Sequence, residues 1–439
     1  MSTVPEKENL KREIGVRSLA LAIVNITVGT GIFVIPAIVA ANLGAAAILA
    51  YLICGLVIFL VALCFAELGS NTSVSGGTYT YIENAFGPFA GFLANNIYWL
   101  GACVFSDAAI ANALADTLGY FFPVFSNEIF RAFFFVVVFG GLAFLNIRSV
   151  KNGIRLVEMT AIGKIIPLIV LVAVASFYIS PSHLKWVSTP TVNTLVSSSL
   201  LLFFAFMGME TPLSNGGEIK NPSRTVPIGI FLAVLMILVL YMAIQLVTQG
   251  VLGDAIAAHK DAPLAAVAGM VFGKTGTVLI IVVTAISMFG ALGSEILSIP
   301  RILYSGARDG LLPKPLSKTH ARFLTPAVAI IVYAGIDLFF AVSGGFTMLA
   351  TISSAASLII YFGIVLATIK LRKKQTQDGA KTFRLPGGMI VPLIAVVVIV
   401  WLLTGLSKEE LTGLGVFTLF LSLLYAAKKL LTKRKSLQR

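Results

Sequence analysis

The chain has 439 residues, of which 58% are apolar and only 12% are charged, and its mean hydropathy is +0.96. This balance excludes an ordinary soluble domain and predicts a protein whose solvent is the lipid bilayer. The net charge of +13 does not indicate nucleic-acid binding, because the basic residues form short clusters beside apolar segments.

The positions of lysine and arginine predict how the chain crosses the membrane. Of 32 such residues, 26 lie in the N-terminal tail, around Lys151 and Lys220, in 301–322, in 370–384 and in the C-terminal tail. These are alternate connections of a twelve-span chain. Because positively charged connections stay in the cytoplasm, we expect both termini there, in a multi-pass protein of the cytoplasmic (inner) cell membrane. The charged start of the chain is unlike a signal peptide.

Apolar segments of about 20 residues, enough to cross ~30 Å of hydrocarbon, follow one another with short connections. They begin near residues 17, 45, 88, 128, 154, 194, 227, 275, 325, 347, 386 and 410. We divide the chain into a cytosolic tail (1–16), five spans (17–180), five further spans (190–372), two last spans (385–432) and a second tail (433–439). The lack of room for a soluble module favours a transporter or channel.

The first span is a poor helix. It contains Gly29, Thr30 and Gly31, with Pro36 following, and each glycine costs ~1 kcal/mol in a helix interior. We expect a break there. The N–H groups of Gly29 to Gly31 at the start of a half-helix would then hold a carboxylate.

The sixth span has a similar interruption, with Gly208, Glu210 and Pro212 after an apolar run. Carbonyls near Thr27, Phe204 and Met207 would accept hydrogen bonds from an ammonium. Interrupted spans at matching positions of two repeats predict a substrate site at the membrane midplane. Close helix packing is the structural alternative for these glycines.

Several ionisable residues fall inside apolar spans, where each is a functional candidate. Lys164 lies about ten residues into the fifth span, Glu210 follows the sixth-span break, and Glu295 has no obvious partner within its own helix. Asp107, Asp116 and Asp337 have no assigned role; they could pair with cations or mark water-filled cavities.

Other chemistry is not indicated. Cys54, Cys64 and Cys103 lie in apolar stretches without C-x-x-C spacing, and the three histidines are scattered, so we expect no disulfide, metal site or cofactor. No phosphate-binding G-x-x-x-x-G-K-[ST] motif occurs, which argues against ATP-driven transport. No nucleophile and base have the spacing of an enzyme site.

Seven motifs in order along almost the whole chain resemble the amino acid, polyamine and organocation (APC) transporter superfamily, in particular bacterial permeases and exchangers. They are GTGIFVIP at 29–36, AELG at 66–69, SGGTY at 75–79, AFGP at 85–88, EIKNPSR at 218–224, RDGLLP at 308–313 and FRLPG at 383–387. The resemblance implies an all-α membrane protein with the leucine-transporter fold, in which ten core helices form two inverted five-helix repeats and two peripheral helices follow.

The resemblance also implies roles for single residues. Lys164 falls where sodium-independent members carry a lysine in place of a sodium ion, and Glu210 matches an acidic position proposed to exchange a proton. Phe204 would be an aromatic gate over the substrate. The third span would contribute residues to the wall of the substrate pocket, namely Tyr98, Gly101, Ala102 and Ser106.

Alternatives remain for the three ionisable residues. Lys164 could form a structural ion pair, and Glu210 could cap a half-helix. Glu295 departs from the exchanger pattern, where a tryptophan stacks on the substrate's guanidinium. Its carboxylate could pair with a cationic side chain, contact a neutral polar one, or pair with a protein cation.

We therefore predict a sodium-independent secondary amino acid transporter, by proton-coupled symport or by exchange, with a cationic substrate slightly favoured over a neutral one. The expected partners are the lipid bilayer, an amino acid and protons. The sequence does not indicate whether an accessory subunit is needed. The alternatives are a polyamine transporter or exchanger, a non-transporting amino acid sensor, and a channel on the same fold.

Overall fold

The computed structural model describes residues 14–70, 78–148, 150–186, 189–213, 219–259, 262–308, 310–323, 325–375, 383–384 and 386–437. Within these ranges the chain is helical, and an isolated bridge between Ile14 and Ile219 is the one β-type pairing. The predicted all-α class is confirmed. Most of the N-terminal tail and parts of four motifs (75–77, 218, 309 and 385) lie outside the described residues.

Seven helical stretches in the described ranges are long and apolar enough to cross a membrane. They are Gly31–Ser70, Pro88–Gly119, Glu128–Arg148, Pro222–Ile256, Pro263–Arg308, Phe346–Arg372 and Lys408–Leu430. Five shorter apolar helices accompany them, and two of these flank the predicted breaks. Length alone does not separate broken from unbroken spans, because three of the shorter helices, Gly163–Tyr178, Ala327–Ser343 and Ile390–Leu403, contain no predicted break.

The first half of the chain provides eight α-helices. They are α1 (Val16–Thr27), α2 (Gly31–Leu43), α3 (Ala47–Ser70), α4 (Thr78–Phe86), α5 (Pro88–Asn96), α6 (Phe105–Gly119), α7 (Glu128–Arg148) and α8 (Val150–Ala175). A π-helical segment, η2 (Ile97–Val104), joins α5 to α6.

The second half begins with α9 (Val192–Phe203) and the short 3-10 helix η6 (Phe204–Phe206). It continues through α10 (Pro222–Leu252), α11 (Pro263–Arg308, kinked at Gly273), α12 (Ala327–Ser343), α13 (Phe346–Gln375), α14 (Ile390–Leu403) and α15 (Lys408–Leu437).

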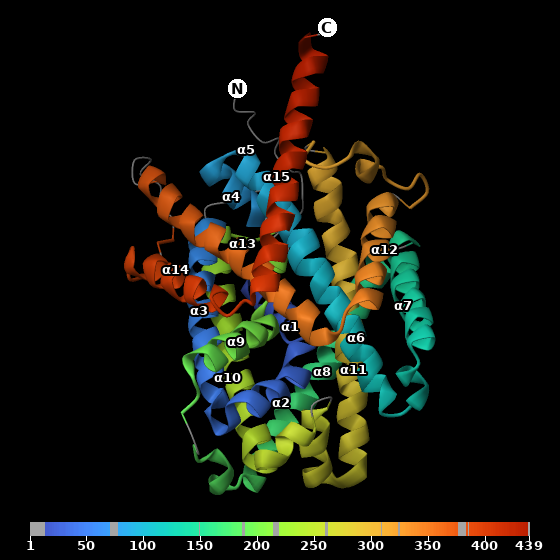
Figure 1. Cartoon of the computed structure of the whole chain (residues 1–439), viewed down its shortest axis with the longest axis vertical. Helices are drawn as coiled ribbons and strands as arrows, with labels where there is room; N and C mark the ends of the chain where they lie inside the picture. Colours follow the sequence, from blue (N-terminus) through green and yellow to red (C-terminus); the bar gives the residue numbers. More distant parts are fainter. Residues whose placement is uncertain are drawn as a thin grey trace.

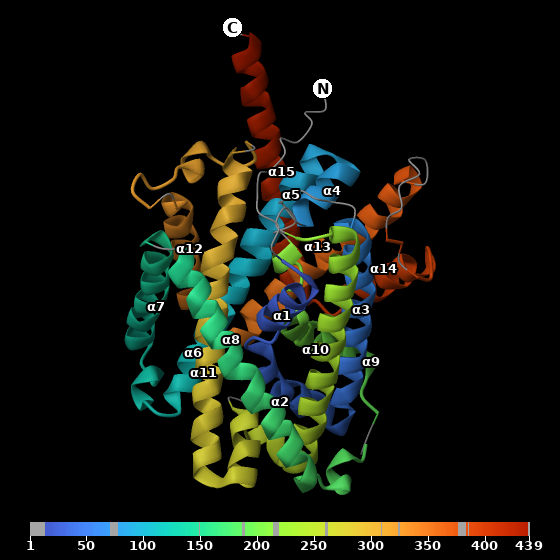
Figure 2. The same ribbon diagram turned by 180° about the vertical axis from the view of Figure 1, so that it is seen from behind.

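Helices from distant parts of the sequence pack in pairs around a common centre (Figures 1 and 2). Helix α10 packs against both α1 and α3, α8 lies along α11, and α7 lies along α12. Helices α6 and α13 pack against each other near the middle of the molecule. The broken helices α1/α2 and α9/η6 are thus enclosed by continuous ones.

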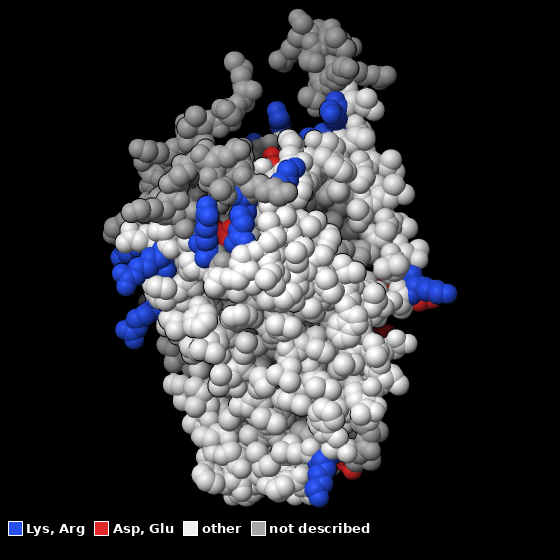
Figure 3. All heavy atoms as spheres, turned by 90° about the vertical axis from the view of Figure 1, so that its left-hand side faces the viewer, with Lys and Arg blue, Asp and Glu red and all other residues white. Residues whose placement is uncertain are grey.

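Basic side chains are unevenly distributed over the surface. Figure 3 shows Lys and Arg gathered mostly over the upper part of one face, above a broad surface of other residues. The C-terminal end of α15 lies at this upper end, as does the α11–α12 connection (Figure 1). Exposed apolar side chains such as Phe231 and Val239 lie along the middle of α10, as expected for a helix that contacts lipid.

Both predicted breaks are present. Helix α1 ends at Thr27 and α2 begins at Gly31, and Pro36 is accommodated inside α2. Helix α9 ends at Phe203, the 3-10 turn η6 follows, Met207 is extended, and Gly208 has φ 102°. Each break leaves backbone N–H and C=O groups without helical partners.

Candidate functional site

The two breaks contact each other, and glycine is what permits the contact. A Cβ at Gly31 would lie 2.6 Å from the Cα atom of Ala205, and one at Gly208 would lie 2.5 Å from Cγ2 of Ile26. Gly208 also needs the left-handed backbone that side chains disfavour. Gly31 and Gly208 therefore allow the two breaks to pack closely.

Tyr241 of α10 ties the two breaks together. Its hydroxyl lies 2.7 Å from the Thr27 carbonyl and 2.9 Å from the Ala205 carbonyl, and the side chain is fully buried. A phenol has a single proton to donate, so the two carbonyls share it. Sequence reasoning missed this residue, because one tyrosine in an apolar helix gives no local signal.

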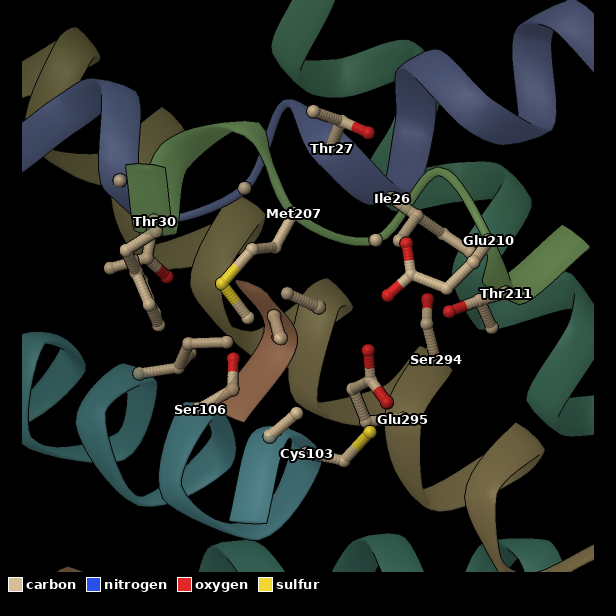
Figure 4. A pocket seen from close by; sticks show the side chains of 18 of the residues that line it. Ile26, Thr27, Thr30, Cys103, Ser106, Met207, Glu210, Thr211, Ser294 and Glu295 are labelled. Carbon is tan, nitrogen blue, oxygen red and sulfur yellow. The ribbon is translucent and has the colours of Figure 1, made fainter. Parts of the chain in front are cut away.

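A cavity of about 60 Å³ lies where the breaks face α6 and α11. A cavity that holds one water needs roughly 10–15 Å³ by the same measure, so this one suits a small polar solute. It is lined by Ile26, Thr27, Gly29, Thr30, Gly31, Tyr98, Ala102, Cys103, Ser106, Ile110, Phe204, Met207, Gly208, Glu210, Thr211, Ala291, Ser294, Glu295 and Ser357. Figure 4 shows these side chains converging from several helices.

Most residues singled out from the sequence meet at this cavity. Of the predicted substrate-binding residues, the lining includes Thr27, Gly29, Thr30, Gly31, Tyr98, Ala102, Ser106, Phe204, Met207, Gly208 and Glu295. Gly101 does not line it. A Cβ there would meet Ala356 of α13 and Phe417 of α15, so Gly101 packs away from the cavity.

Seven lining residues were not anticipated: Ile26, Cys103, Ile110, Thr211, Ala291, Ser294 and Ser357. Helical spacing could have found Ala291, which lies four residues before Glu295 on the same face of α11. Ser294 lies three residues after Ala291 and so also neighbours that face. Cys103 and Ile110 could have been found around Ser106 in the same way. Ser357 carried no signal, since nothing in the sequence of α13 points to the site.

The side of the cavity formed by α2 is suited to an anion. Thr30 precedes the first turn of α2, where free N–H groups and the helix dipole favour negative charge. Its side chain is 2% exposed, and Oγ1 has no hydrogen-bond partner among the described residues. The Thr27 carbonyl is less available for an ammonium, because it already accepts from the Gly29 N–H (2.7 Å) as well as from Tyr241.

The opposite side is acidic. Glu210 accepts a 2.5 Å hydrogen bond from the hydroxyl of Tyr361 in α13. Oε2 of Glu295 is buried without a partner in the described ranges. Figure 4 shows the two carboxyl groups directed into the same space. None of the residues that line the cavity is a lysine or arginine.

Lys164 lies outside the cavity lining but contacts the broken helix. Its Nζ donates a 2.6 Å hydrogen bond to the Asn25 carbonyl, and the side chain is 2% exposed. This carbonyl is near the C-terminal end of α1, where the helix dipole favours a cation. The Lys164 ammonium therefore gives the Asn25 carbonyl a hydrogen-bond donor that lipid could not supply.

Phe204 separates the cavity from a second pocket. Its ring meets that of Phe346 edge-on, with centroids 5.8 Å apart, and Phe346 lines a pocket of about 450 Å³ between α2, α6 and the start of α13. Asn42 and Asp116 make that pocket partly polar. The two rings thus lie between the buried cavity and a wider opening.

The chain resembles known transporters over nearly its whole length. The family model "Amino acid permease" matches residues 14–422. The branched-chain amino acid permease BcaP of Bacillus subtilis (strain 168) is 26% identical, covering 91% of this chain and 89% of that protein. The serine/threonine exchanger SteT of the same organism is 27% identical, covering 89% and 90%. Its methylthioribose transporter is 28% identical, covering 92% and 91%.

A match across 14–422, together with apolar helices throughout the described ranges, defines a multi-pass cell membrane protein. The relatives are transporters rather than enzymes, and most move amino acids. The chain therefore belongs to the amino acid permease family of the APC superfamily and is an amino acid transporter.

Proposed function

We propose that the cavity at the two breaks is the substrate site of a secondary active transporter. The observation that carries this proposal is the unpaired Thr30 hydroxyl at the N-terminus of α2, facing a cavity with acidic groups on its other side. An α-amino acid has a carboxylate that suits the N-terminus of α2 and an ammonium that suits the acidic side. The carboxylate binds at Thr30 and Gly31, because the Gly29 N–H already donates to the Thr27 carbonyl. The ammonium lies toward Phe204, Met207 and Glu210.

The proposed architecture has twelve spans, with two inverted five-helix repeats and both termini in the cytoplasm. Two findings support it. The two breaks, at α1/α2 and at α9/η6, each lie in the first span of a proposed repeat. On the face drawn in Figure 3 most Lys and Arg side chains lie toward the upper end, in keeping with the positive-inside rule.

Coupling is proposed to be independent of sodium. The Lys164 ammonium occupies a position against the Asn25 carbonyl that a cation would otherwise fill. Movement of its proton, or of a proton on Glu210, would loosen contacts at a break and favour one side of the membrane. This coupling serves either proton symport or exchange, and Phe204 acts as the gate toward the second pocket.

For the side chain of the substrate we propose a small neutral amino acid. The cavity volume supports this choice, and so do the substrates in the names of two relatives, branched-chain amino acids and serine or threonine. The cationic class, favoured slightly by the sequence, is the second candidate because Glu295 has an unpaired carboxyl oxygen facing the cavity.

Counterflow in proteoliposomes tests both proposals. Vesicles are preloaded with serine, leucine, lysine or arginine at equal internal and external pH without sodium, and uptake of the labelled amino acid is measured. We expect uptake with lumenal serine or leucine. Uptake with lysine or arginine alone would reverse the substrate assignment, and a requirement for sodium would contradict the role of Lys164.

The polyamine alternative is tested with the same vesicles. Putrescine has no carboxylate, so it would leave the N–H groups of Thr30 and Gly31 without a ligand. We expect a large excess of putrescine to leave amino acid counterflow unchanged. Putrescine counterflow without any amino acid counterflow would favour the polyamine transporter. Binding of an amino acid without any flux would favour the sensor.

A further inference from the structure

A pair of fully buried aspartates lies where α6 packs against α12. Asp107 of α6 and Asp337 of α12 are both 0% exposed. The hydroxyl of Tyr333 in α12 donates a 3.0 Å hydrogen bond to Oδ2 of Asp107. Asp337 follows Tyr333 by one helical turn, so it lies on the same face of α12, toward α6.

Three of the four carboxyl oxygens in this pair lack a protein partner. Oδ1 of Asp107 and both oxygens of Asp337 have no hydrogen bond within the part of the chain that the structure describes. A buried, ionised and unpaired carboxylate is very costly. Because no described residue bonds these three oxygens, they call for a ligand or a proton.

A proton is the ligand that fits. The described residues contain no group of three His, Cys, Asp or Glu side chains arranged to hold a metal ion. Arg131 of α7 does not reach the pair, because its guanidinium is paired with Asp116 and with the Asn112 amide oxygen at 2.9 Å. A proton on either carboxyl removes the cost of one buried negative charge.

The pair lies directly behind the wall of the substrate cavity. Asp107 follows Ser106, and it is one turn from Cys103; both of these line the cavity. Asp107 and Asp337 each interact electrostatically with Glu295, whose unpaired oxygen faces the cavity. The titratable or charged groups that face this region from the surrounding elements are Tyr333, Glu295, Cys103, Tyr98, Glu210 and Arg131.

Polar groups continue from the pair toward the surface. The Asn112 amide donates a 2.8 Å hydrogen bond to the Ala341 carbonyl, one turn beyond Asp337 on α12. Asn112 in turn accepts from Arg131, which is 23% exposed and pairs with Asp116, 40% exposed. Asp116 also lines the second pocket. The interface between α6 and α12 therefore has one end with exposed polar side chains and one end that is buried.

We propose that Asp107 and Asp337 form a proton-binding site behind the substrate cavity that fills from the end where Asp116 and Arg131 are exposed. Proton uptake converts one carboxylate into a carboxylic acid and requires no reactant besides a proton from the aqueous phase. This inference rests on the proposed function, because the proton on the pair sets the charge next to the substrate and gives transport its dependence on pH.

Two readouts test the site. The first is the infrared difference spectrum between neutral and acidic pH, in which a protonated carboxyl gives a distinct C=O stretching band. The second is the pH profile of counterflow. In Asp337→Asn we expect loss of a carboxyl band and a midpoint about one pH unit lower, because removing a like charge weakens proton binding by the remaining acids. Asp254→Asn, which alters an exposed aspartate, should match wild type.

Further variants keep the test decisive. Should Asp337→Asn not fold, as judged by size-exclusion chromatography, Tyr333→Phe retains the ring and removes only the donor to Asp107, so it should also shift the infrared band. An unchanged band and an unchanged pH profile in folded Asp337→Asn and Asp107→Asn would overturn the inference. Wild-type protein without any amino acid counterflow would instead overturn the proposed function, and the infrared readout would still decide the proton site.

Discussion

The cavity has two walls of different construction. The backbone wall consists of the breaks at 28–31 and 204–208, and the side-chain wall consists of Ser106, Ser294 and Glu295 on α6 and α11. The backbone wall presents N–H and C=O groups, which substitution cannot alter without moving the chain. The side-chain wall can change one residue at a time. We therefore propose that the first wall recognises the common amino acid group and that the second selects the side chain.

The largest effect is expected in the backbone wall. Gly31→Val places side-chain atoms where the backbone of Ala205 lies, so it should separate the two breaks and reduce transport by ~100-fold or more. Counterflow in proteoliposomes measures the loss. Gly140→Val is the matched control, because a Cβ at Gly140 meets nothing within 4 Å. Equal transport by the two variants would mean that contact between the breaks is not needed.

Lys164→Met should have the next largest effect. It keeps the length of the side chain and removes the donor to the Asn25 carbonyl, a loss of about 2 kcal/mol or ~30-fold in transport rate. The measurement is the initial rate of counterflow at several pH values. Lys274→Met, at an exposed lysine, should leave the rate near wild type. Full activity of Lys164→Met would show that transport does not need the hydrogen bond from Lys164 to the Asn25 carbonyl.

Tyr241→Phe tests whether one hydroxyl holds the backbone wall together. Two buried carbonyls lose their shared donor, which should cost about 1–2 kcal/mol and lower the transport rate by ~10-fold. Tyr51→Phe is the control, since the buried Tyr51 hydroxyl has no partner among the described residues. A similar loss in both variants would show a general effect of removing buried hydroxyls.

The smallest effect on a neutral substrate is expected in the side-chain wall. Glu295→Gln keeps the shape of the side chain, so the apparent KM for serine should change by less than ~3-fold, whereas a cationic substrate would lose a charge-assisted bond and ~10-fold in KM. Competition by serine and by lysine distinguishes the cases. A large rise in the apparent KM for serine would show that the Glu295 carboxyl contacts the common amino acid group. The two walls would then not have separate roles.

The backbone wall could be predicted from the sequence because it violates a local rule. Glycines in the middle of an apolar span weaken a helix wherever the span lies, so Gly29, Gly31 and Gly208 marked both breaks. The side-chain wall was predicted less completely. The family resemblance placed Gly101 on the wall, but η2 is a π-helical segment whose wider turn changes which residues share a face.

The sequence by itself determined the membrane class, the two breaks and the buried ionisable residues, because hydropathy, helix propensity and the cost of buried charge act over a few residues. Only the tertiary structure decided which of these groups meet. Tyr333 bonds Asp107 across 226 positions, and Tyr241 bonds the Thr27 carbonyl across 214. Such pairs depend on which helices pack together, and no local pattern along the chain carries that information.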